Sequence, residues 1–371
     1  MNRNIGSVLV LSKGFPPTNG GVESYSKSIA DEYQRLGVSV KVLTAKKSKT
    51  AFLSTPYEVE TVVSGYQIVN FFQFIAMLLT FRFRRERYDF IHATTWRVAL
   101  PAVLVFPHTT CFVTAHGNEI LVKGILQRIM KWTLGRVFLI LCVSDYTKNL
   151  VLQRCSGLNS KLLSVHNGLT VDCSNDDFHN KWVSRPDYIK VFSVCRHEKR
   201  KNLISAVYAF KYVVEGAEYK IAGDGPQTAQ LSSVICDPNE RIDRVKMLGR
   251  VSDIQLRELY AESHIFLHPQ KEDVLGGDVE GFGLVVADAM AMECVPIAGN
   301  NGGTKELISD GFNGILLDDC DPSEIARCLN ELIQNYTRAR EMAVAARQYA
   351  VSNFSWRKHV QEILESIEAA I

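Results

Sequence analysis

Short apolar runs alternate with helical patterns along this chain, and the alternation starts afresh in the second half. In the first half, the runs that we interpret as strands cover 7–12, 38–44, 89–93, 110–114, 139–143 and 162–166. In the second half, they cover 189–194, 218–222, 245–248, 264–268, 294–298 and 314–317. Strands that alternate with helices form parallel sheets that are covered by helices on both faces. The sequence therefore predicts an α/β chain with two doubly wound domains.

The helical patterns support the same division. The clearest amphipathic segment of the first half is 22–36, and the segments of the second half lie near 202–215, 253–261, 283–291, 322–334 and 337–351. The polar stretch 173–187 interrupts the two series and is the best candidate for a linker. A chain of 371 residues can bury two cores of ordinary size. We therefore expect one domain up to residue 172 and a second over 188–354.

Two glycines stand where the second domain turns into an apolar helix. Gly281 and Gly283 remove side chains just before that helix, which leaves its first amides unpaired and able to attract a phosphate. Glu280 precedes the helix, and Asp288 lies about one turn beyond Leu284 on a shared helix face. The two acids therefore flank the turn and do not touch each other.

The run Glu280-Gly-Phe-Gly-Leu-Val-Val-Ala-Asp288 and the loop Asn300–Glu306 closely resemble the retaining glycosyltransferases of family 4. The resemblance implies the GT-B fold, in which two Rossmann-like domains face a central cleft. It also implies that Glu280 lies beside the sugar of a nucleotide-sugar donor and that Asp288, where the family has Glu, binds the ribose. The donor site would then include Phe282, Gly283 and Leu284.

Three further motifs match the family in the right order. Gly20 and Gly21 resemble its first glycine-rich loop, which approaches the diphosphate or the acceptor, although an ordinary strand-to-helix turn would look the same. His116, between Ala115 and Gly117, resembles the active-site histidine, and the alternative is a turn histidine that the backbone satisfies. Arg196 and Lys201 match two cations that bind the diphosphate, and the alternative is a surface pair. Cys195 and Asn202 replace the two glycines of that last pattern.

The resemblance covers nearly the whole chain and assigns roles to the domains. Residues 165–172 resemble the end of the first domain, which would bind the acceptor, and 188–354 would bind the donor. The last helix, near 355–370, would cross back onto the first domain. We expect transfer of a hexose from GDP-mannose or a UDP-sugar, with retention at the anomeric carbon, to a glycan or lipid-linked acceptor in surface polysaccharide or glycolipid synthesis.

The expected mechanism needs no metal and no cofactor. Arg196, Lys201 and the amides after Glu280 would stabilise the charge that builds on the diphosphate. The resemblance implies attack on the same face of the sugar, with Glu280 and His116 orienting it. Asp319-Cys-Asp321 matches the DxD pattern of metal-dependent glycosyltransferases, but it precedes Pro322 and a helical pattern, so we interpret it as a helix cap.

Other functions stay open. A catalytically silent GT-B scaffold or partner subunit would explain Asp288, Cys195 and Asn202, and a nucleotide-sugar epimerase or a phosphorylase could share the fold. A dinucleotide oxidoreductase is disfavoured, because no G-x-G-x-x-G follows the first strand. The sequons at Asn335 and Asn353 fit chance better than glycosylation.

Composition adds weaker constraints. The net charge of +2 gives no case for a nucleic-acid partner, and nine cysteines without a CxxC pair favour neither disulfides nor a zinc cluster. The first apolar run is too short for a signal peptide, so we expect a cytoplasmic protein.

Segment 68–87 combines apolar bulk with cations. Its apolar part is too short to span a bilayer and contains Asn70, Gln73 and Thr80. It is followed by Arg82, Arg84, Arg85 and Arg87. The pattern suits a helix that lies on the anionic inner face of the cytoplasmic membrane, and the alternative is a core helix with a solvated basic end.

Overall fold

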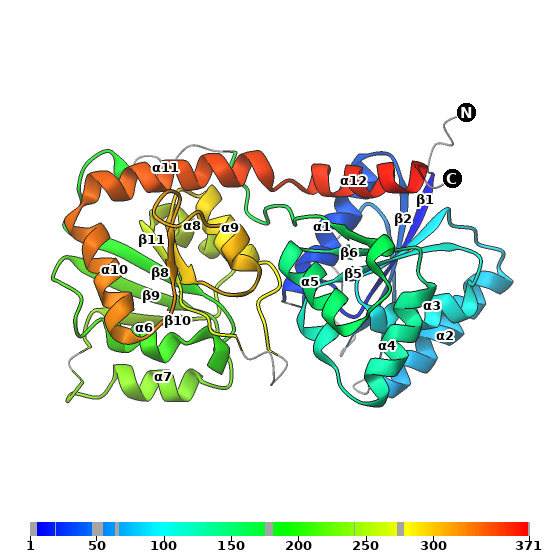
Figure 1. The fold of residues 1–371 in the computed structure, drawn as a ribbon, viewed down its shortest axis with the longest axis horizontal. Helices are drawn as coiled ribbons and strands as arrows, with labels where there is room; N and C mark the ends of the chain where they lie inside the picture. The colour runs from blue at the N-terminus through cyan, green and yellow to red at the C-terminus, as the bar shows by residue number, and fades with distance from the viewer. Residues whose placement is uncertain are drawn as a thin grey trace. The chain divides into compact units, whose positions relative to one another are not determined.

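The computed structural model describes residues 6–18, 20–46, 55–63, 67–174, 181–240, 242–272 and 278–369. The chain forms two compact units, Met1–Gly168 together with Ser355–Ile371, and Leu169–Phe354 (Figure 1). Each unit is built on one parallel sheet, so the predicted α/β class with two doubly wound domains is confirmed. Gly276 and Gly277, which precede Asp278 in the sequence, lie outside the described residues.

The first unit contains a seven-stranded sheet in the order β3-β2-β1-β4-β5-β6-β7. Its strands are β1 (Ser7–Ser12), β2 (Ser39–Lys46), β3 (Glu58–Val63), β4 (Phe90–Ala93), β5 (Thr110–Ala115), β6 (Leu139–Cys142) and β7 (Leu162–Ser164). Its helices are α1 (Gly21–Arg35), α2 (Gln67–Phe83), α3 (Trp96–Val105), α4 (Ile125–Arg136), α5 (Asp145–Arg154) and α12 (Trp356–Glu368). The central strand β1 buries Val8 to Leu11 completely, as a parallel strand with helices on both faces must.

The second unit repeats this plan with a six-stranded sheet in the order β10-β9-β8-β11-β12-β13. Its strands are β8 (Ile189–Val194), β9 (Ala217–Ala222), β10 (Val245–Gly249), β11 (Ile265–His268), β12 (Val295–Gly299) and β13 (Ile315–Leu317). Its helices are α6 (Leu203–Ala209), α7 (Thr228–Ile235), α8 (Asp253–Glu262), α9 (Leu284–Ala291), α10 (Pro322–Gln334) and α11 (Tyr336–Asn353). In both units the strand order reverses beside the first strand, which is where doubly wound sheets bind ligands.

The last helix, α12, belongs to the first unit. It packs against α1 and buries Val360, Ile363 and Ile367 in the core of that unit. His359 fixes it further, because its Nε2 lies 2.9 Å from the Tyr25 hydroxyl and its Nδ1 donates to the carbonyl of His166 at 2.9 Å. The C-terminus of the chain therefore completes the polar interior of the first unit.

The described end of the predicted linker is not a linker. Trp182 is 1% exposed within the core of the second unit, and its indole N–H donates to the Glu293 carbonyl at 2.9 Å. The Lys181 ammonium donates to the carbonyls of Tyr260, Ser263 and Met292 at 3.2, 2.6 and 2.8 Å, at the ends of α8 and α9. A cation is favourable at helix C-termini. The linker prediction is therefore corrected at this end, and 175–180 lie outside the described residues.

The interpretation of Asp319-Cys-Asp321 as a helix cap is confirmed. The Asp321 carboxylate accepts a hydrogen bond from the Glu324 amide at 2.8 Å, and Pro322 occupies the first turn of α10. Those hydrogen bonds, chiefly from Glu324 and Ser323, lower the pKa of Asp321.

Candidate active site

The second unit gathers its charged side chains at the carboxyl ends of β8 and β11. After β8 the chain makes one 3-10 turn, Lys199–Lys201, and enters α6 through Asn202, whose φ is 54°. Asparagine tolerates this left-handed conformation better than other non-glycine residues. That tolerance explains how Asn202 can stand where the family pattern has glycine. Its side chain also donates to the Cys320 carbonyl at 2.8 Å.

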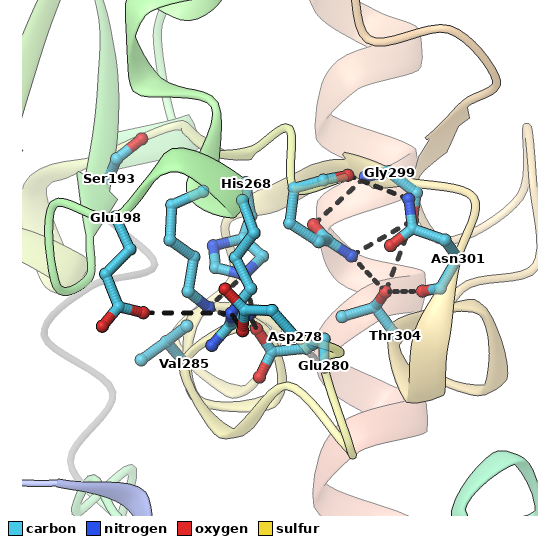
Figure 2. A network of polar contacts seen from close by, with 12 residues as sticks. Ser193, Glu198, His268, Asp278, Glu280, Val285, Gly299, Asn301 and Thr304 are labelled. Carbon is cyan, nitrogen blue, oxygen red and sulfur yellow. Dashed lines mark hydrogen bonds and ion pairs between the residues drawn. The ribbon is translucent and has the colours of Figure 1, made fainter. Parts of the chain in front are cut away.

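The centre of the cluster is the Glu280 carboxylate. Its Oε2 atom accepts from Arg200 Nη1 at 2.7 Å and forms an ion pair with the Lys201 ammonium, and His268 Nε2 lies 3.5 Å away. The side chains of Arg200, Lys201 and Glu280 are only 12%, 8% and 16% exposed. Figure 2 shows Glu280 and Asp278 pointing into this group of contacts, with His268 above them and Glu198 to their left.

The charges of this cluster settle its protonation. Burial alone would raise the pKa of Glu280, but Lys201, the His268 hydrogen bond and Arg200 together hold it well below its usual value. Burial and the neighbouring Lys201 charge lower the pKa of His268 to about 4, so its imidazole is neutral. The site therefore presents an ionised carboxylate near neutral pH. His268 Nε2 also lies 3.3 Å from the Lys201 ammonium, and because the ring is neutral, Nε2 makes one of these two bonds at a time: it donates to Glu280 or accepts from Lys201, according to its tautomer.

Arg196 does not join this cluster. Its side chain is 68% exposed, and its Nη1 atom lies 3.0 Å from Glu198 Oε1. The structure therefore brings Lys201 and Glu280 together but leaves Arg196 at the surface. Arg196 is linked to the cluster only through Glu198, whose Oε2 atom is 3.9 Å from Arg200 Nε. The expected pair of cations, Arg196 and Lys201, shares no direct contact in this state.

Close backbone packing fixes the chain around Glu280. Gly283 begins α9 with a φ of 95°, and a Cβ there would meet the Thr304 methyl group. The Gly303 amide donates to the Glu280 carbonyl at 2.8 Å, and a Cβ at Gly302 or Gly303 would collide with the backbone of Glu280 or Gly281. Glycine is required at these points because any side chain would force the two loops apart.

A second polar network supports the same loop. The Gln270 side chain donates to the Gly299 carbonyl at 3.2 Å and to the Thr304 hydroxyl, which itself donates to the Asn301 carbonyl at 2.7 Å. Figure 2 shows Gly299, Asn301 and Thr304 beside the Glu280 group. These bonds hold the loop after β12 in one position.

The remaining residues predicted around the donor occupy different surroundings. Leu284 is the first residue of α9. Phe282 is 3% exposed and packs edge-to-face on Phe354 with ring centroids 5.4 Å apart, so its ring serves the core.

Asp288 points at its own chain. Its Oδ1 atom accepts from the amides of Thr170 and Val171 at 2.7 and 3.4 Å, and its Oδ2 atom accepts from the Thr170 hydroxyl. The residue is 3% exposed, and burial raises its pKa to about 6 despite these bonds. In this state the carboxylate that was expected to bind ribose is occupied by residues 170 and 171.

The first unit holds His116 at the carboxyl end of β5. Its Nε2–H donates to the Thr94 carbonyl at 2.9 Å, and its backbone amide donates to Glu119 Oε1 at 2.6 Å. Burial lowers the pKa of His116 to about 3, and its ring packs edge-to-face on Tyr25 with centroids 4.8 Å apart. A neutral ring that donates from Nε2 has an acceptor lone pair at Nδ1. His116 can therefore accept a hydrogen bond from a hydroxyl group.

The glycine loop of the first unit wraps around a carboxylate. Gly20 precedes α1 in an extended conformation, with a φ of 161°, and Gly21 begins the helix. A Cβ at Gly14 or Gly20 would meet the Glu23 carboxylate. Gly14 and Gly20 therefore allow Glu23 to lie against this loop.

Two members of the Glu280 cluster were not singled out from the sequence. Arg200 is adjacent to Lys201 in the run Lys199-Arg-Lys201, which looks like a solvated basic turn. His268 ends an apolar strand that offers no sign of its contacts across the sheet. Among the described residues, no group of three or more His, Cys, Asp or Glu side chains could hold a metal ion.

Comparison with known proteins decides the class of enzyme. Residues 19–172 match the model of Glycosyltransferase Family 4, and residues 174–349 match that of Glycosyl transferases group 1. Together the two models span residues 19–349, and the chain is a glycosyltransferase. It is accordingly a transferase with the GT-B fold, as the resemblance implied.

The relatives span nearly the whole chain. The GDP-mannose-dependent alpha-(1-6)-phosphatidylinositol monomannoside mannosyltransferase of Mycobacterium tuberculosis is 24% identical over 380 residues, which cover 94% of each protein. The sucrose-phosphate synthase of Thermosynechococcus elongatus superposes with a TM-score of 0.82 at 16% identity, covering 99% of this chain and 100% of that one. Anabaena Alr3699/HepE in complex with UDP and glucose gives 0.78 at 19% identity, covering 98% and 100%. These two structures support the fold alone.

Proposed function

We propose that this glycosyltransferase moves a hexose from a nucleoside-diphosphate sugar to a glycan or lipid-linked acceptor, with retention at the anomeric carbon. The observation that carries the proposal is the buried, ionised Glu280 with Lys201 on its Oε2 atom, immediately before the start of α9. A carboxylate, a mobile ammonium and helix amides at one point suit a sugar joined to a diphosphate.

The charge that develops in the reaction explains this arrangement. Cleavage of the bond between the anomeric carbon and the diphosphate oxygen leaves negative charge on the diphosphate, which Lys201, Arg196 and the first amides of α9 would stabilise. Arg196 is exposed enough to turn toward a ligand. The acceptor attacks from the face that the diphosphate leaves, and the departing phosphate oxygen takes the acceptor proton. No step in this sequence requires a metal.

Two groups that accept hydrogen bonds would hold the sugar itself. Glu280 accepts hydrogen bonds from sugar hydroxyls through the carboxylate oxygen that Arg200 and Lys201 do not occupy. His116, neutral with its Nε2–H on Thr94, accepts from a hydroxyl through Nδ1. Gly20 and Gly21 let the chain approach the substrate closely.

The donor is proposed to be GDP-mannose or a UDP-sugar. The mycobacterial relatives are named as GDP-mannose-dependent enzymes, and the Anabaena relative was crystallised with UDP and glucose. The acceptor is proposed to belong to surface polysaccharide or glycolipid synthesis, since relatives include an amylovoran biosynthesis glycosyltransferase and phosphatidylinositol monomannoside mannosyltransferases.

A silent scaffold is the second candidate, and the position of Asp288 favours it. Its carboxylate is bound by Thr170 and Val171 and is not free for a ribose. Such a protein would keep the fold of the family without binding the donor.

A thermal-shift panel of UDP, GDP, ADP and their common sugars, with magnesium or with EDTA, tests both the glycosyltransferase and the scaffold proposals. A ligand present at 100 times its Kd stabilises the native state by about 2.7 kcal/mol. We expect a shift that is selective for one base and survives EDTA. A shift that EDTA abolishes would contradict metal independence. If no nucleotide shifts the melting temperature, the donor proposal fails and the scaffold is favoured.

We further propose that the first unit binds the membrane surface through an apolar-basic surface on α2 and α4. Most of the predicted segment 68–87 forms α2, which packs on α3, and α3 packs on α4 (Figure 1). The helix ends at Phe83, so the prediction is corrected for Arg84, Arg85 and Arg87, which lie beyond it. The sequences of these three helices contain no Asp or Glu. No helix in the described part of the chain is long and apolar enough to cross a bilayer.

Exposed apolar side chains lie on both α2 and α4, and α4 also carries exposed cations. On α2, Ile68, Phe72 and Phe83 are 73%, 64% and 84% exposed. On α4, Ile125, Leu126 and Trp132 are exposed beside Arg128, Lys131 and Arg136. Arg136 stacks over the Trp132 ring at 3.6 Å. Apolar side chains that enter the interface beside cations are what an anionic lipid surface binds.

Vesicle co-sedimentation tests this surface. The double variant Phe72→Ser and Phe83→Ser should bind phosphatidylglycerol vesicles at least about tenfold more weakly, since burial of each phenyl ring contributes about 2 kcal/mol. Phe312→Ser, which removes a ring that is 67% exposed in the second unit, should bind as the unchanged protein does. Equal binding by all three proteins, or equal binding to neutral vesicles, would disprove the membrane contact.

A further inference from the structure

Two cations converge on one oxygen of Glu280, although the proposed reaction needs only one of them for the diphosphate. We propose that Arg200 is a positioning residue that holds the Glu280 carboxylate in place when Lys201 transfers its contact to the donor diphosphate. The inference rests on the proposed function and assigns a role to a residue outside the family motif that matched this chain.

The contacts of Arg200 differ in kind from those of Lys201. The guanidinium is surrounded by carboxylates: Nη1 is 2.7 Å from Glu280 Oε2, and Nε is 2.5 Å from Asp278 Oδ1 and 3.9 Å from Glu198 Oε2. These charges raise the pKa of Arg200 against the effect of its burial. Several fixed carboxylates around a planar guanidinium leave it little freedom to follow a ligand.

Lys201 has the opposite character. Apart from Glu280, its hydrogen-bonding partner is His268, a neutral imidazole at 3.3 Å. The Lys201 ammonium sits on a flexible side chain. When it moves away from Glu280 and His268, it loses only one ion pair, the one with Glu280. A diphosphate can replace that contact, so Lys201 is the mobile member of the pair.

The departure of Lys201 creates the need for Arg200. A diphosphate brings further negative charge beside a buried carboxylate, and like charges favour protonation of that carboxylate. A protonated or displaced Glu280 would no longer accept hydrogen bonds at the sugar. Arg200, already in contact with the same oxygen, supplies the compensating charge throughout the reaction. The arrangement thus separates two tasks, since Lys201 meets the leaving group while Arg200 keeps the carboxylate in place.

The substitution Arg200→Met tests this division. We expect the Kd for the nucleoside diphosphate to stay within about threefold, because Arg200 does not bind phosphate, while turnover falls about 100-fold or more. We also expect the acidic limb of the pH–rate profile to move to higher pH. Arg200→Lys should recover part of the turnover, since it restores the charge without the second contact to Asp278.

Two other variants separate positioning from alternative roles. Arg196→Met should weaken diphosphate binding as well as turnover, and an equal loss of binding in Arg200→Met would make Arg200 a phosphate ligand and overturn the proposal. Asp278→Asn removes the charge of one partner of Arg200 and leaves the contact between Arg200 and Glu280, so it should keep most of the turnover. If Asp278→Asn loses as much as Arg200→Met, Arg200 acts only by holding the loop, and the proposal fails.

A double-mutant cycle in the ligand-free protein tests whether Arg200 holds Glu280, even if the chain binds no nucleotide. Lys201→Met imitates the departure of the ammonium, and Arg200→Met removes the residue that remains. If either cation suffices to hold Glu280, the melting temperature of the double variant should fall by more than the two single losses together, because only the double variant leaves a buried carboxylate unpaired. Additive losses would overturn the role of Arg200. Absence of nucleotide binding with a positive coupling would refute the proposed function alone.

Discussion

Glu280→Gln is expected to lower turnover of the nucleotide-sugar donor by about 10² to 10³-fold while the protein stays folded. The amide has the shape of the carboxylate but lacks its charge, so Arg200 and Lys201 lose their shared counter-ion in a site where all three side chains are mostly buried. A neutral group also accepts weaker hydrogen bonds from sugar hydroxyls. Initial rates at saturating donor, with acceptor and in its absence, measure the loss.

Glu262→Gln is the matched control. Glu262 lies on α8 of the same unit, pairs with Lys190 and Lys220 at 2.7 Å each, and is 34% exposed. Its neutralisation removes one carboxylate from between two lysines without touching the Glu280 cluster. We expect its turnover to stay within about twofold, as for a surface ion pair worth no more than about 1 kcal/mol. If Glu280→Gln keeps half of the normal rate, Glu280 does not act at the reacting sugar.

The sheet strands could be predicted because parallel strands with helices on both faces are nearly continuous apolar runs. The run 189–194 is β8 to the residue, and Pro322 marks the start of α10. Several elements were not predicted, among them α3, α4 and α5 of the first unit, and two others show why. The edge strand β3, Glu58–Val63, mixes acidic and apolar residues, and α7, Thr228–Ile235, buries only Leu231. An element with little buried surface leaves a weak periodic signal.

The candidate site could also be predicted only in part. Glu280 and Lys201 were predicted from motifs, and the structure joins them across 79 positions of sequence. Arg200 and His268 could not be assigned, because their roles depend on their contacts with Glu280, which lies on another element. Neither residue is part of a sequence motif. The shorter side chain of Asp288 was visible, but its bonds to Thr170 depend on where the chain passes after β7. Spacing predicts which residues share an element and says little about contacts between elements.

Acidification from pH 7 to pH 5 is expected to destabilise the first unit by on the order of 6 kcal/mol through three histidines of lowered pKa, namely His116 and the pair His92 and His359. Both side chains of the pair are at most 1% exposed, and burial together with neighbouring histidines lowers their pKa values to about 3 and about 4. The unfolded chain titrates near 6.5 and binds more protons than the folded chain below that pH. Stability is therefore full above pH 6.5 and falls as the pH drops toward 4, by about 2 kcal/mol per histidine at pH 5.

Hydrogen exchange of the α12 amides at the two pH values measures this effect where it arises. His359 Nε2 and Thr114 both contact the Tyr25 hydroxyl at 2.9 Å, and His92 Nε2 lies 2.8 Å from the Thr114 hydroxyl, so one buried network joins α12 to the sheet. His359→Gln should abolish about a third of the pH dependence, since His92 and His116 contribute the rest, whereas His108→Gln, at an exposed position in the same unit, should leave it intact. An unchanged pH dependence in His359→Gln would mean that α12 is held by its apolar face alone. The expected result makes the C-terminal helix a polar as well as an apolar part of the first unit, because its histidine must stay neutral for the network to form.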